Sequence, residues 1–185
     1  MNLGAGTCST RSYTFSSPGL DLAIISLDQR NSRFANELVR LGYAPVTLDD
    51  IVNEPSREGA EIYTVGFPGA TALMGQIKLD PEMTKWSSSD YSLPIYSYGR
   101  VSMLHEALHF FWGDISVYPG NSGGPVVENE KLVGIVSAQP VIPLGQAEDQ
   151  TENLEMPIPF GKIIKAKFLP ELFAIQEQKD ANLKQ

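Results

Sequence analysis

The stretch Gly120-Asn121-Ser122-Gly123-Gly124-Pro125 is the most informative part of the chain. A serine that acts as a nucleophile must be exposed on a tight turn, with backbone N–H groups directed at the place where negative charge develops on a substrate carbonyl oxygen. Glycines on both sides of Ser122 allow the unusual backbone angles and the close approach that such a turn demands. The same six residues would also suit a solvent-exposed turn between strands, so the stretch alone leaves both interpretations open.

Short apolar runs separated by glycine and proline surround this stretch, a pattern typical of β structure with turns. Directly after it, two apolar strands are predicted, joined by a turn at residues 128–131. The predicted strands are 12–15, 20–27, 44–48, 61–65, 100–104, 109–115, 125–128 and 132–137. The chain is therefore expected to be mostly β.

Residues 33–41 predict a short helix inserted among these strands. Phe34, Leu38 and Leu41 fall on one face of this helix, and Gly42 supplies a stop signal.

The C-terminal part of the chain also predicts helix. Apolar residues recur at roughly helical spacing over 163–175, and Pro170 either breaks this helix or begins a second one in its first turn. The polar tail after Gln176 is expected to fray or to extend into solvent. Residues 141–159, which carry several acids without the regular spacing of a calcium loop, predict a solvated polar loop.

Length and composition limit the classes of protein that fit. The chain has 185 residues and a net charge of −8, from 14 Lys plus Arg against 22 Asp plus Glu, and no basic run that would neutralise nucleic-acid phosphates. Its one cysteine, Cys8, excludes an intramolecular disulfide framework and a Cys-based zinc cluster. The sequence has no long apolar segment and no secretory signal, and if Met1 is the native start we expect a cytoplasmic protein.

Three further motifs precede the serine in order: GLDLAII at 19–25, VGFPG at 65–69 and DIS at 114–116. With these motifs the chain resembles the trypsin-like serine proteases, especially bacterial ones without disulfides, such as the HtrA-type and glutamyl-endopeptidase-like groups. The similarity runs collinearly from about residue 20 to about residue 137, and motifs in this order are much more specific than any one alone. The resemblance implies a chymotrypsin-like double β-barrel and a serine-type endopeptidase with a polypeptide substrate and no cofactor.

The resemblance also implies an organisation in three parts. Residues 1–60 would form a partial first barrel with the inserted helix, 61–160 a second barrel carrying the nucleophile, and 161–185 a C-terminal helical segment and tail. The first barrel is expected to be incomplete because too few strands precede or contain Asp21 to close it and hide its edges.

Carried over residue by residue, the resemblance makes Ser122 the nucleophile and assigns the oxyanion hole to the N–H groups of Gly120 and Ser122. Asp21 matches the carboxylate that orients the catalytic imidazole, although alone it would pass for an ordinary acid at a strand edge. Ser116 matches the base of the primary specificity pocket, and because it is not an acid, small or modestly apolar substrate side chains are expected there. Strand 133–137 and the residues after it match the edge that pairs with an extended substrate backbone. The substrate-binding residues are thus Ser116, Ser137, Ala138 and Gln139.

The sequence departs from the family pattern in its histidines. The base that removes the serine proton should precede the aspartate, but both histidines, His105 and His109, follow Asp21. Two explanations remain open: the chain lacks an N-terminal portion that carries the base, which we prefer, or it is a catalytically inactive pseudoprotease that binds peptides. In either case we expect this chain alone to be inactive, because an unactivated serine hydroxyl is a poor nucleophile.

His105-Glu106-Ala107-Leu108-His109 also spells the H-E-x-x-H signature of zinc peptidases. On a helix the two histidines would share a face and bind zinc while Glu106 activates a water. The serine-protease motifs instead require this segment to be a hairpin that turns near Glu106. A zinc metallopeptidase is therefore the third hypothesis, behind the serine endopeptidase and the pseudoprotease.

Overall fold

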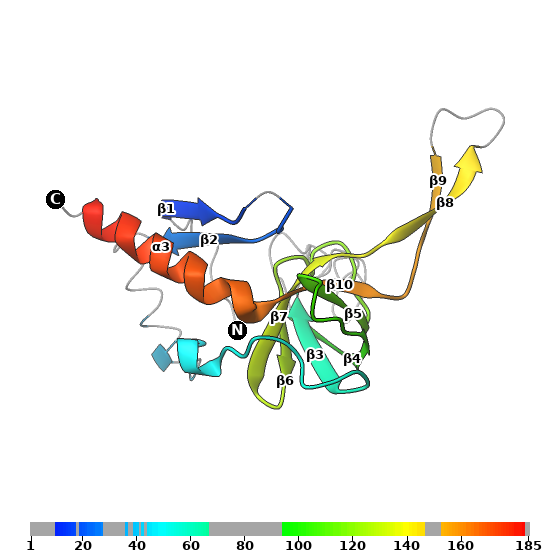
Figure 1. Cartoon of the computed structure of the whole chain (residues 1–185), viewed down its shortest axis with the longest axis horizontal. Helices are drawn as coiled ribbons and strands as arrows, with labels where there is room; N and C mark the ends of the chain where they lie inside the picture. Colours follow the sequence, from blue (N-terminus) through cyan, green and yellow to red (C-terminus); the bar gives the residue numbers. More distant parts are fainter. Residues whose placement is uncertain are drawn as a thin grey trace, which may run out of the picture.

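The computed structural model describes residues 10–17, 19–27, 36, 39–40, 42, 44–66, 94–146 and 153–183. Within them the chain is mostly β structure, with a closed barrel, two separate two-stranded sheets and a C-terminal helix (Figure 1). The fold is the expected one, a double barrel whose first barrel is incomplete in the described ranges. The predicted helix at 33–41 lies mostly outside those ranges. No described helix has the length and apolar character that crossing a membrane would require.

The closed barrel is antiparallel and has six strands. In spatial order these are β10 (Gly161–Lys165), β5 (Phe110–Asp114), β4 (Ile95–Met103), β3 (Glu61–Gly66), β6 (Pro125–Glu128) and β7 (Lys131–Ala138). Alternate residues point inward, as on β3, where every second residue is buried. The core includes Ile62, Val101, Phe111, Val126, Val133, Val136 and Ile163. Each such side chain contributes about 1.5–3 kcal/mol through burial, so the barrel is a rigid support for the loops at its ends.

The tight turn between β6 and β7 was predicted, and the structure shows how the chain makes it. Asn129 and Glu130 both have positive φ, 48° and 64°. Positive φ at both central residues matches the twist of an antiparallel hairpin. Asn adopts this conformation more readily than most residues, which suits the first of the two positions.

Two strands near the N-terminus form a separate ribbon, β1 (Thr10–Phe15) and β2 (Ala23–Leu27), which lies along the C-terminal helix α3 (Leu169–Asn182) (Figure 1). One face of the ribbon makes polar contacts with this helix. Thr14 Oγ1 donates to Gln176 Oε1 at 2.9 Å, and the hydroxyls of Ser12 and Ser26 donate to the two carboxylate oxygens of Asp180 at 2.7 and 2.5 Å. These contacts stabilise α3, which continues to Asn182. The chain after Gln176 is therefore helical and does not fray, although most of its described residues are exposed, as expected for a tail that extends into solvent.

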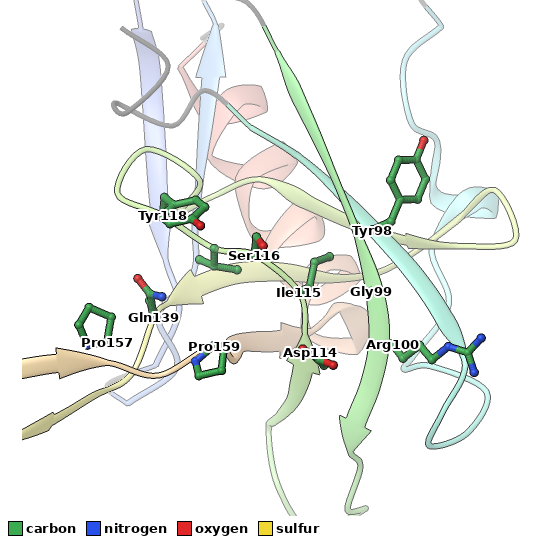
Figure 2. Close-up of a pocket in the computed structure, with 11 residues that line it drawn as sticks. Tyr98, Gly99, Arg100, Asp114, Ile115, Ser116, Tyr118, Gln139, Pro157 and Pro159 are labelled. Carbon is green, nitrogen blue, oxygen red and sulfur yellow. The ribbon is translucent and has the colours of Figure 1, made fainter. Parts of the chain in front are cut away.

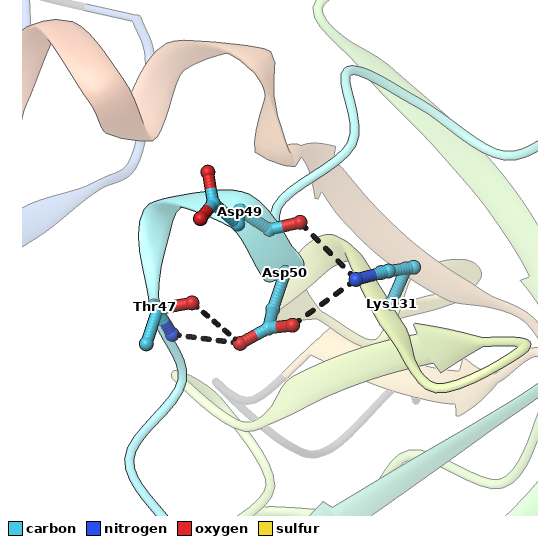
Figure 3. A network of polar contacts seen from close by, with 4 residues as sticks. All are labelled: Thr47, Asp49, Asp50 and Lys131. Carbon is cyan, nitrogen blue, oxygen red and sulfur yellow. Dashed lines mark hydrogen bonds and ion pairs between the residues drawn. The ribbon is translucent and has the colours of Figure 1, made fainter.

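The strand predicted at 44–48 is absent: residues 44–47 have no regular structure, and a 3₁₀-helix, η2, spans Leu48–Asp50. Asp50, the last residue of η2, stabilises the turn because its Oδ2 accepts hydrogen bonds from the N–H and Oγ1 of Thr47, the N-cap, at 3.0 and 2.7 Å (Figure 3). Lys131 Nζ donates to Asp50 Oδ1 at 3.1 Å and to the Asp49 carbonyl at 3.2 Å. The Thr47 and Lys131 contacts lower the pKa of Asp50 to about 2 and tie η2 to the start of β7.

Residues 141–159 were predicted to be a polar loop, but they contain two strands. β8 (Val141–Gln146) and β9 (Asn153–Pro157) pair antiparallel and project from the barrel as an arm (Figure 1). Val141, Ile142 and Met156 on this arm are exposed. Pro143 and Gly145 interrupt β8, and such residues weaken the sequence signal of a strand.

The C-terminal segment differs from the helical prediction at its start. Ile163 and Ile164 belong to β10, which lies between β5 and β7 and closes the barrel. Four of the five residues of β10 are buried, so it has no alternation to distinguish it from a buried helix. Pro170 then lies in the first turn of α3, where its missing N–H has no intrahelical partner to lose.

Candidate functional site

The loop that carries Ser122 is a tight turn at one end of the barrel. Gly120 and Gly123 have φ of 103° and 84°, values that residues with a side chain rarely adopt. Asn121 N–H donates to the carbonyl of Tyr118 at 2.9 Å and closes the first part of the turn. Ser122 is exposed at the top of this loop.

The loop is fastened to β7 by backbone hydrogen bonds. Gly123 N–H donates to the carbonyl of Val136 at 2.8 Å, and Val136 N–H donates to the carbonyl of Gly124 at 2.9 Å. Gly124 must lack a side chain, because a Cβ would lie 2.8 Å from the carbonyl oxygens of both Asn121 and Val65. The serine is therefore held on a backbone that only glycines permit.

Ser137 connects Ser122 to Asp21. Ser122 Oγ donates to the Ser137 carbonyl at 3.0 Å, and Ser137 Oγ donates to Asp21 Oδ2 at 2.6 Å. The pairing of β7 with β10 shifts register beside Ser137, between the partners of Lys162 and Ile163. Such bulges redirect side chains near functional sites. Hydrogen bonds of Ser137 thus link three residues that the sequence analysis selected, Ser122, Ser137 and Asp21. The contact between Ser137 and Asp21 was not predicted, because the position of Ser137 at the end of an apolar strand gives no sign of it.

A buried amide supports the serine loop from below. Asn121 is 1% exposed, and neither its Oδ1 nor its Nδ2 has a hydrogen-bond partner in the described part of the chain. Its side chain fills the space above Gly66, where a Cβ would lie 3.0 Å from the carboxamide. The neighbouring Thr64 is also fully buried, but its Oγ1 donates to the Pro125 carbonyl at 2.7 Å. Asn121 and Thr64 are thus both buried polar side chains under the same loop, but only Thr64 makes a hydrogen bond in the described part of the chain.

The two N–H groups assigned to the oxyanion hole, those of Gly120 and Ser122, are on the surface of this loop. Across residues 94–146 and the other described ranges, neither N–H donates to a protein acceptor. Exposed amides without an acceptor are able to bind an oxygen that carries negative charge. The assignment of these groups still comes from the resemblance.

The residues expected to pair with a substrate backbone lie where β7 ends. Ala138 is exposed and pairs with Lys162 of β10. The Gln139 side chain donates from Nε2 to the carbonyl of Ile158 at 3.3 Å, which holds the start of the β8–β9 arm against the barrel. Gln139 therefore stands between the serine site and the arm.

Ser116 and Gln139 line one pocket of about 610 Å³, which Figure 2 shows. Ser137 and Ala138 are outside its lining. Asp114, two residues before Ser116, also lines the pocket. Asp114 was not predicted to line this pocket, because no local pattern distinguishes it from an ordinary acid at a strand end. The other lining residues are Tyr98, Gly99, Arg100, Ile115, Val117, Tyr118, Pro157 and Pro159.

The two histidines lie away from the serine. Both are in the connection between β4 and β5, which is the predicted hairpin turn and not a helix. The carbonyl of His105 accepts a hydrogen bond from Lys165 Nζ at 2.7 Å, and that of His109 accepts one from the Lys165 N–H at 3.0 Å. Lys165 pairs across the sheet with Gly134. Gly134 is three residues from Ser137, or about 10 Å along the strand. Neither histidine is therefore beside Ser122.

The zinc hypothesis required the histidines to share a helical face. His105 Nδ1 accepts the N–H of Ala107 at 3.2 Å, and His109 Nε2 is buried without a partner among the described residues. The described part of the chain brings no three His, Cys, Asp or Glu side chains together as a metal-ligand set. The H-E-x-x-H spacing is here a loop sequence, and the ligand geometry proposed for it is not formed.

Comparison with known proteins gives a family. A family model described as "Trypsin-like peptidase domain" matches residues 5–135. No curated protein sequence is significantly similar to the chain. Among solved structures, Rv3671c from M. tuberculosis H37Rv, a serine-to-alanine mutant in an inactive form, is similar with a TM-score of 0.48 and 15% sequence identity. The similarity covers 90% of this chain and 64% of that one, so the chain spans less than about two thirds of that protein.

Proposed function

The chain belongs to the trypsin-like peptidase family, and we propose that it carries the nucleophile and the orienting acid of a serine endopeptidase that hydrolyses peptide bonds through an acyl-enzyme. The observation that supports this most is the hydrogen-bonded chain from Ser122 through Ser137 to Asp21. A solvent-exposed turn with no catalytic role would have no reason to bring these three groups together. The polypeptide substrate class follows from the family.

In the proposed reaction Ser122 Oγ attacks the scissile carbonyl, and a base removes its proton. The developing oxyanion is stabilised by the N–H groups of Gly120 and Ser122. The base then protonates the leaving amine, and water hydrolyses the acyl-enzyme by the reverse sequence. Ser137 holds Asp21 through a charge-assisted hydrogen bond, and Asp21 in turn orients the base.

The base is the part of this mechanism for which the described residues offer no candidate. Ser122 Oγ donates to a backbone carbonyl, which cannot take its proton. Asp21 is exposed, and its Oδ1 has no hydrogen-bond partner among the described residues. An imidazole placed beside this oxygen would be oriented as the mechanism needs. We therefore propose that this chain alone is inactive, and that a histidine from an additional polypeptide segment completes the site.

Rescue with free imidazole tests the proposal. A fluorophosphonate reagent, which reacts with activated serines, should label the chain slowly in buffer and at least about tenfold faster with imidazole. This gain is smaller than the roughly 100- to 10,000-fold of a positioned base, because free imidazole is not held in place. Intact-mass and peptide analysis should locate the label on Ser122. Ser122→Ala should abolish labelling, and Asp21→Asn should retain slow labelling but lose the rescue. Rescue that is equal in Asp21→Asn would contradict the role given to that carboxylate.

A second function, a peptide-binding pseudoprotease, has one observation in its favour. The Ser122 hydroxyl donates to the Ser137 carbonyl, a contact that suits a structural serine as well as a resting nucleophile. This alternative predicts that an extended peptide binds at Ser137–Gln139 while imidazole leaves fluorophosphonate labelling unchanged. Fluorophosphonate labelling measured with and without imidazole therefore distinguishes the two proposals.

A further inference from the structure

A second cavity lies between β2, η2, β7 and α3, apart from the serine loop. Its volume of about 510 Å³ is within the range of about 300–1,000 Å³ typical of ligand sites. Ser122, Asp21 and the residues expected to bind substrate are all outside its lining. We propose that this cavity, the ribbon–helix pocket, binds a single-chain aliphatic amine, with the hydrocarbon chain inside and the ammonium group at Glu177. The inference goes beyond the proposed function and does not depend on it.

The walls of the ribbon–helix pocket are largely apolar. Ile24 of β2, Ile135 of β7 and Phe173 of α3 line it from three elements. Thr47 is the one uncharged polar residue of the described lining, and Asp50 engages its N–H, hydroxyl and carbonyl. A polar ligand would therefore lose hydrogen bonds to water that the interior does not replace, whereas a hydrocarbon chain has none to lose.

Hydrogen bonds fix the elements around the pocket. Val52 N–H donates to the Leu132 carbonyl at 3.0 Å, and Lys131 Nζ donates to Asp50, so η2 is held against β7 (Figure 3). The polar contacts described above hold the ribbon against α3. Because the walls are held apart in this way, they do not close on one another, and their apolar surface stays in contact with water. Covering that surface with a ligand is favourable.

Two apolar residues of the lining face solvent. Val46 and Leu48 are 61% and 56% exposed, which is unusual for large aliphatic side chains that lie next to a pocket. A chain that enters the pocket between them would remove part of this surface from water.

One carboxylate sets the charge of the pocket. Glu177 is the only titratable residue of the described lining, and it makes no hydrogen bond or ion pair with another described residue. It is exposed, so an ammonium group beside it keeps part of its hydration and does not have to be buried. A ligand carboxylate at the same place would be repelled. The pocket therefore favours a cationic end group over an anionic one.

Titration of the chain with hexylamine, octylamine and decylamine tests the apolar part of the inference. The dissociation constants would be measured by NMR, at amine concentrations below those at which micelles form. Each added methylene should tighten binding about fourfold, because it buries one more apolar group in the pocket. A dissociation constant that does not change with chain length would overturn the proposed site.

Comparison of decylamine with decanoate tests the role of Glu177. The amine should bind about tenfold more tightly, since one end group is attracted to the carboxylate and the other is repelled. Glu177→Gln should remove most of this preference. Glu171→Gln is the matched control, because it removes another exposed acid of α3 that is outside the lining. It changes the net charge of −8 equally and should leave the preference unchanged.

Filling the pocket tests its location. Ala23 is an exposed lining residue, so Ala23→Phe places a ring in the space proposed for the chain. This variant should bind decylamine at least about tenfold more weakly, as expected when several methylenes lose their place, with the melting temperature nearly unchanged. Ala174→Phe makes the same exchange at an exposed position of α3 outside the lining and should bind decylamine as the parent does.

Unchanged binding in Ala23→Phe would overturn the location of the site. Decanoate that binds as tightly as decylamine, or an amine preference that survives Glu177→Gln, would overturn the class of ligand.

Discussion

The buried carboxamide of Asn121 gives the sharpest prediction about the serine loop. Asn121→Leu replaces it with an apolar group of similar size at a site that is 1% exposed. Neither carboxamide atom has a partner in the described structure, and an unsatisfied buried polar group costs about 1–3 kcal/mol. The substitution should therefore raise the free energy of unfolding by about 2 kcal/mol, although most core substitutions lower it.

Thr64→Val is the matched control, since it also exchanges a buried polar group for an apolar one under the same loop. Thr64 differs in that its hydroxyl donates to the Pro125 carbonyl at 2.7 Å. Its removal loses this hydrogen bond and leaves the carbonyl with one partner fewer. We expect Thr64→Val to lower the free energy of unfolding by about 1 kcal/mol.

Thermal and urea unfolding measure both variants. With a shift of about 2–4 °C per kcal/mol for a chain of this size, Asn121→Leu should melt about 4–8 °C above the parent and Thr64→Val about 2–4 °C below it. Melting of both variants below the parent would refute the reasoning, because it would mean that the Asn121 amide has a partner.

Three other outcomes follow from the geometry. Gly99→Ala should prevent folding, as judged by circular dichroism and urea unfolding, because a Cβ there would lie 1.8 Å from the Asp114 carbonyl oxygen. The pKa of Asp50 is lowered from 3.8 to about 2 in the folded chain, so its stabilising contribution is present above pH 3.8 and is lost as the pH falls toward 2. Urea midpoints measured across that range should fall less steeply in Asp50→Asn. Ser137→Ala removes the hydrogen bond to Asp21 and should lower the imidazole-rescued labelling rate several-fold with the melting temperature nearly unchanged.

Sequence patterns identified the strands that face a core on one side. Residues 125–128 were predicted with the bounds that β6 has. β3 differs from its prediction by one residue at one end, and β5 and β7 differ by one residue at each end. The patterns failed at β10 and at the β8–β9 arm. Ile163 and Ile164 on β10 lie in a nearly continuous buried run, and Pro143 and Gly145 interrupt the sequence of β8.

Only part of the candidate site could be predicted from the sequence, because some of its residues depend on local backbone geometry and others on tertiary contacts. The glycines around Ser122 could be interpreted from the sequence, because the positive φ and the close backbone contacts that require them belong to the turn itself. Asp21 was selected by resemblance, and its contact with Ser137 depends on how the β1–β2 ribbon sits against the barrel. The position of Asp114 in the pocket beside Ser116 was not predicted, because it depends on the pairing of β4 with β5, which periodicity does not record.

The exposed apolar face of the β1–β2 ribbon and the Asp21 carboxylate belong to the same part of the chain. On the face of the β1–β2 ribbon opposite α3, Tyr13, Phe15 and Ile25 are 58%, 70% and 58% exposed. α3 covers the other face of the ribbon, and an exposed apolar patch of this kind favours a further covering layer. Asp21, whose second carboxylate oxygen has no described partner, lies in the connection between these two strands. If the additional segment proposed above covered this face, it would run close to the acid, and the same segment would then stabilise the ribbon and supply the base. Imidazole should then restore reactivity at Ser122 without changing the melting temperature, because it replaces the chemical contribution of such a segment and not its packing.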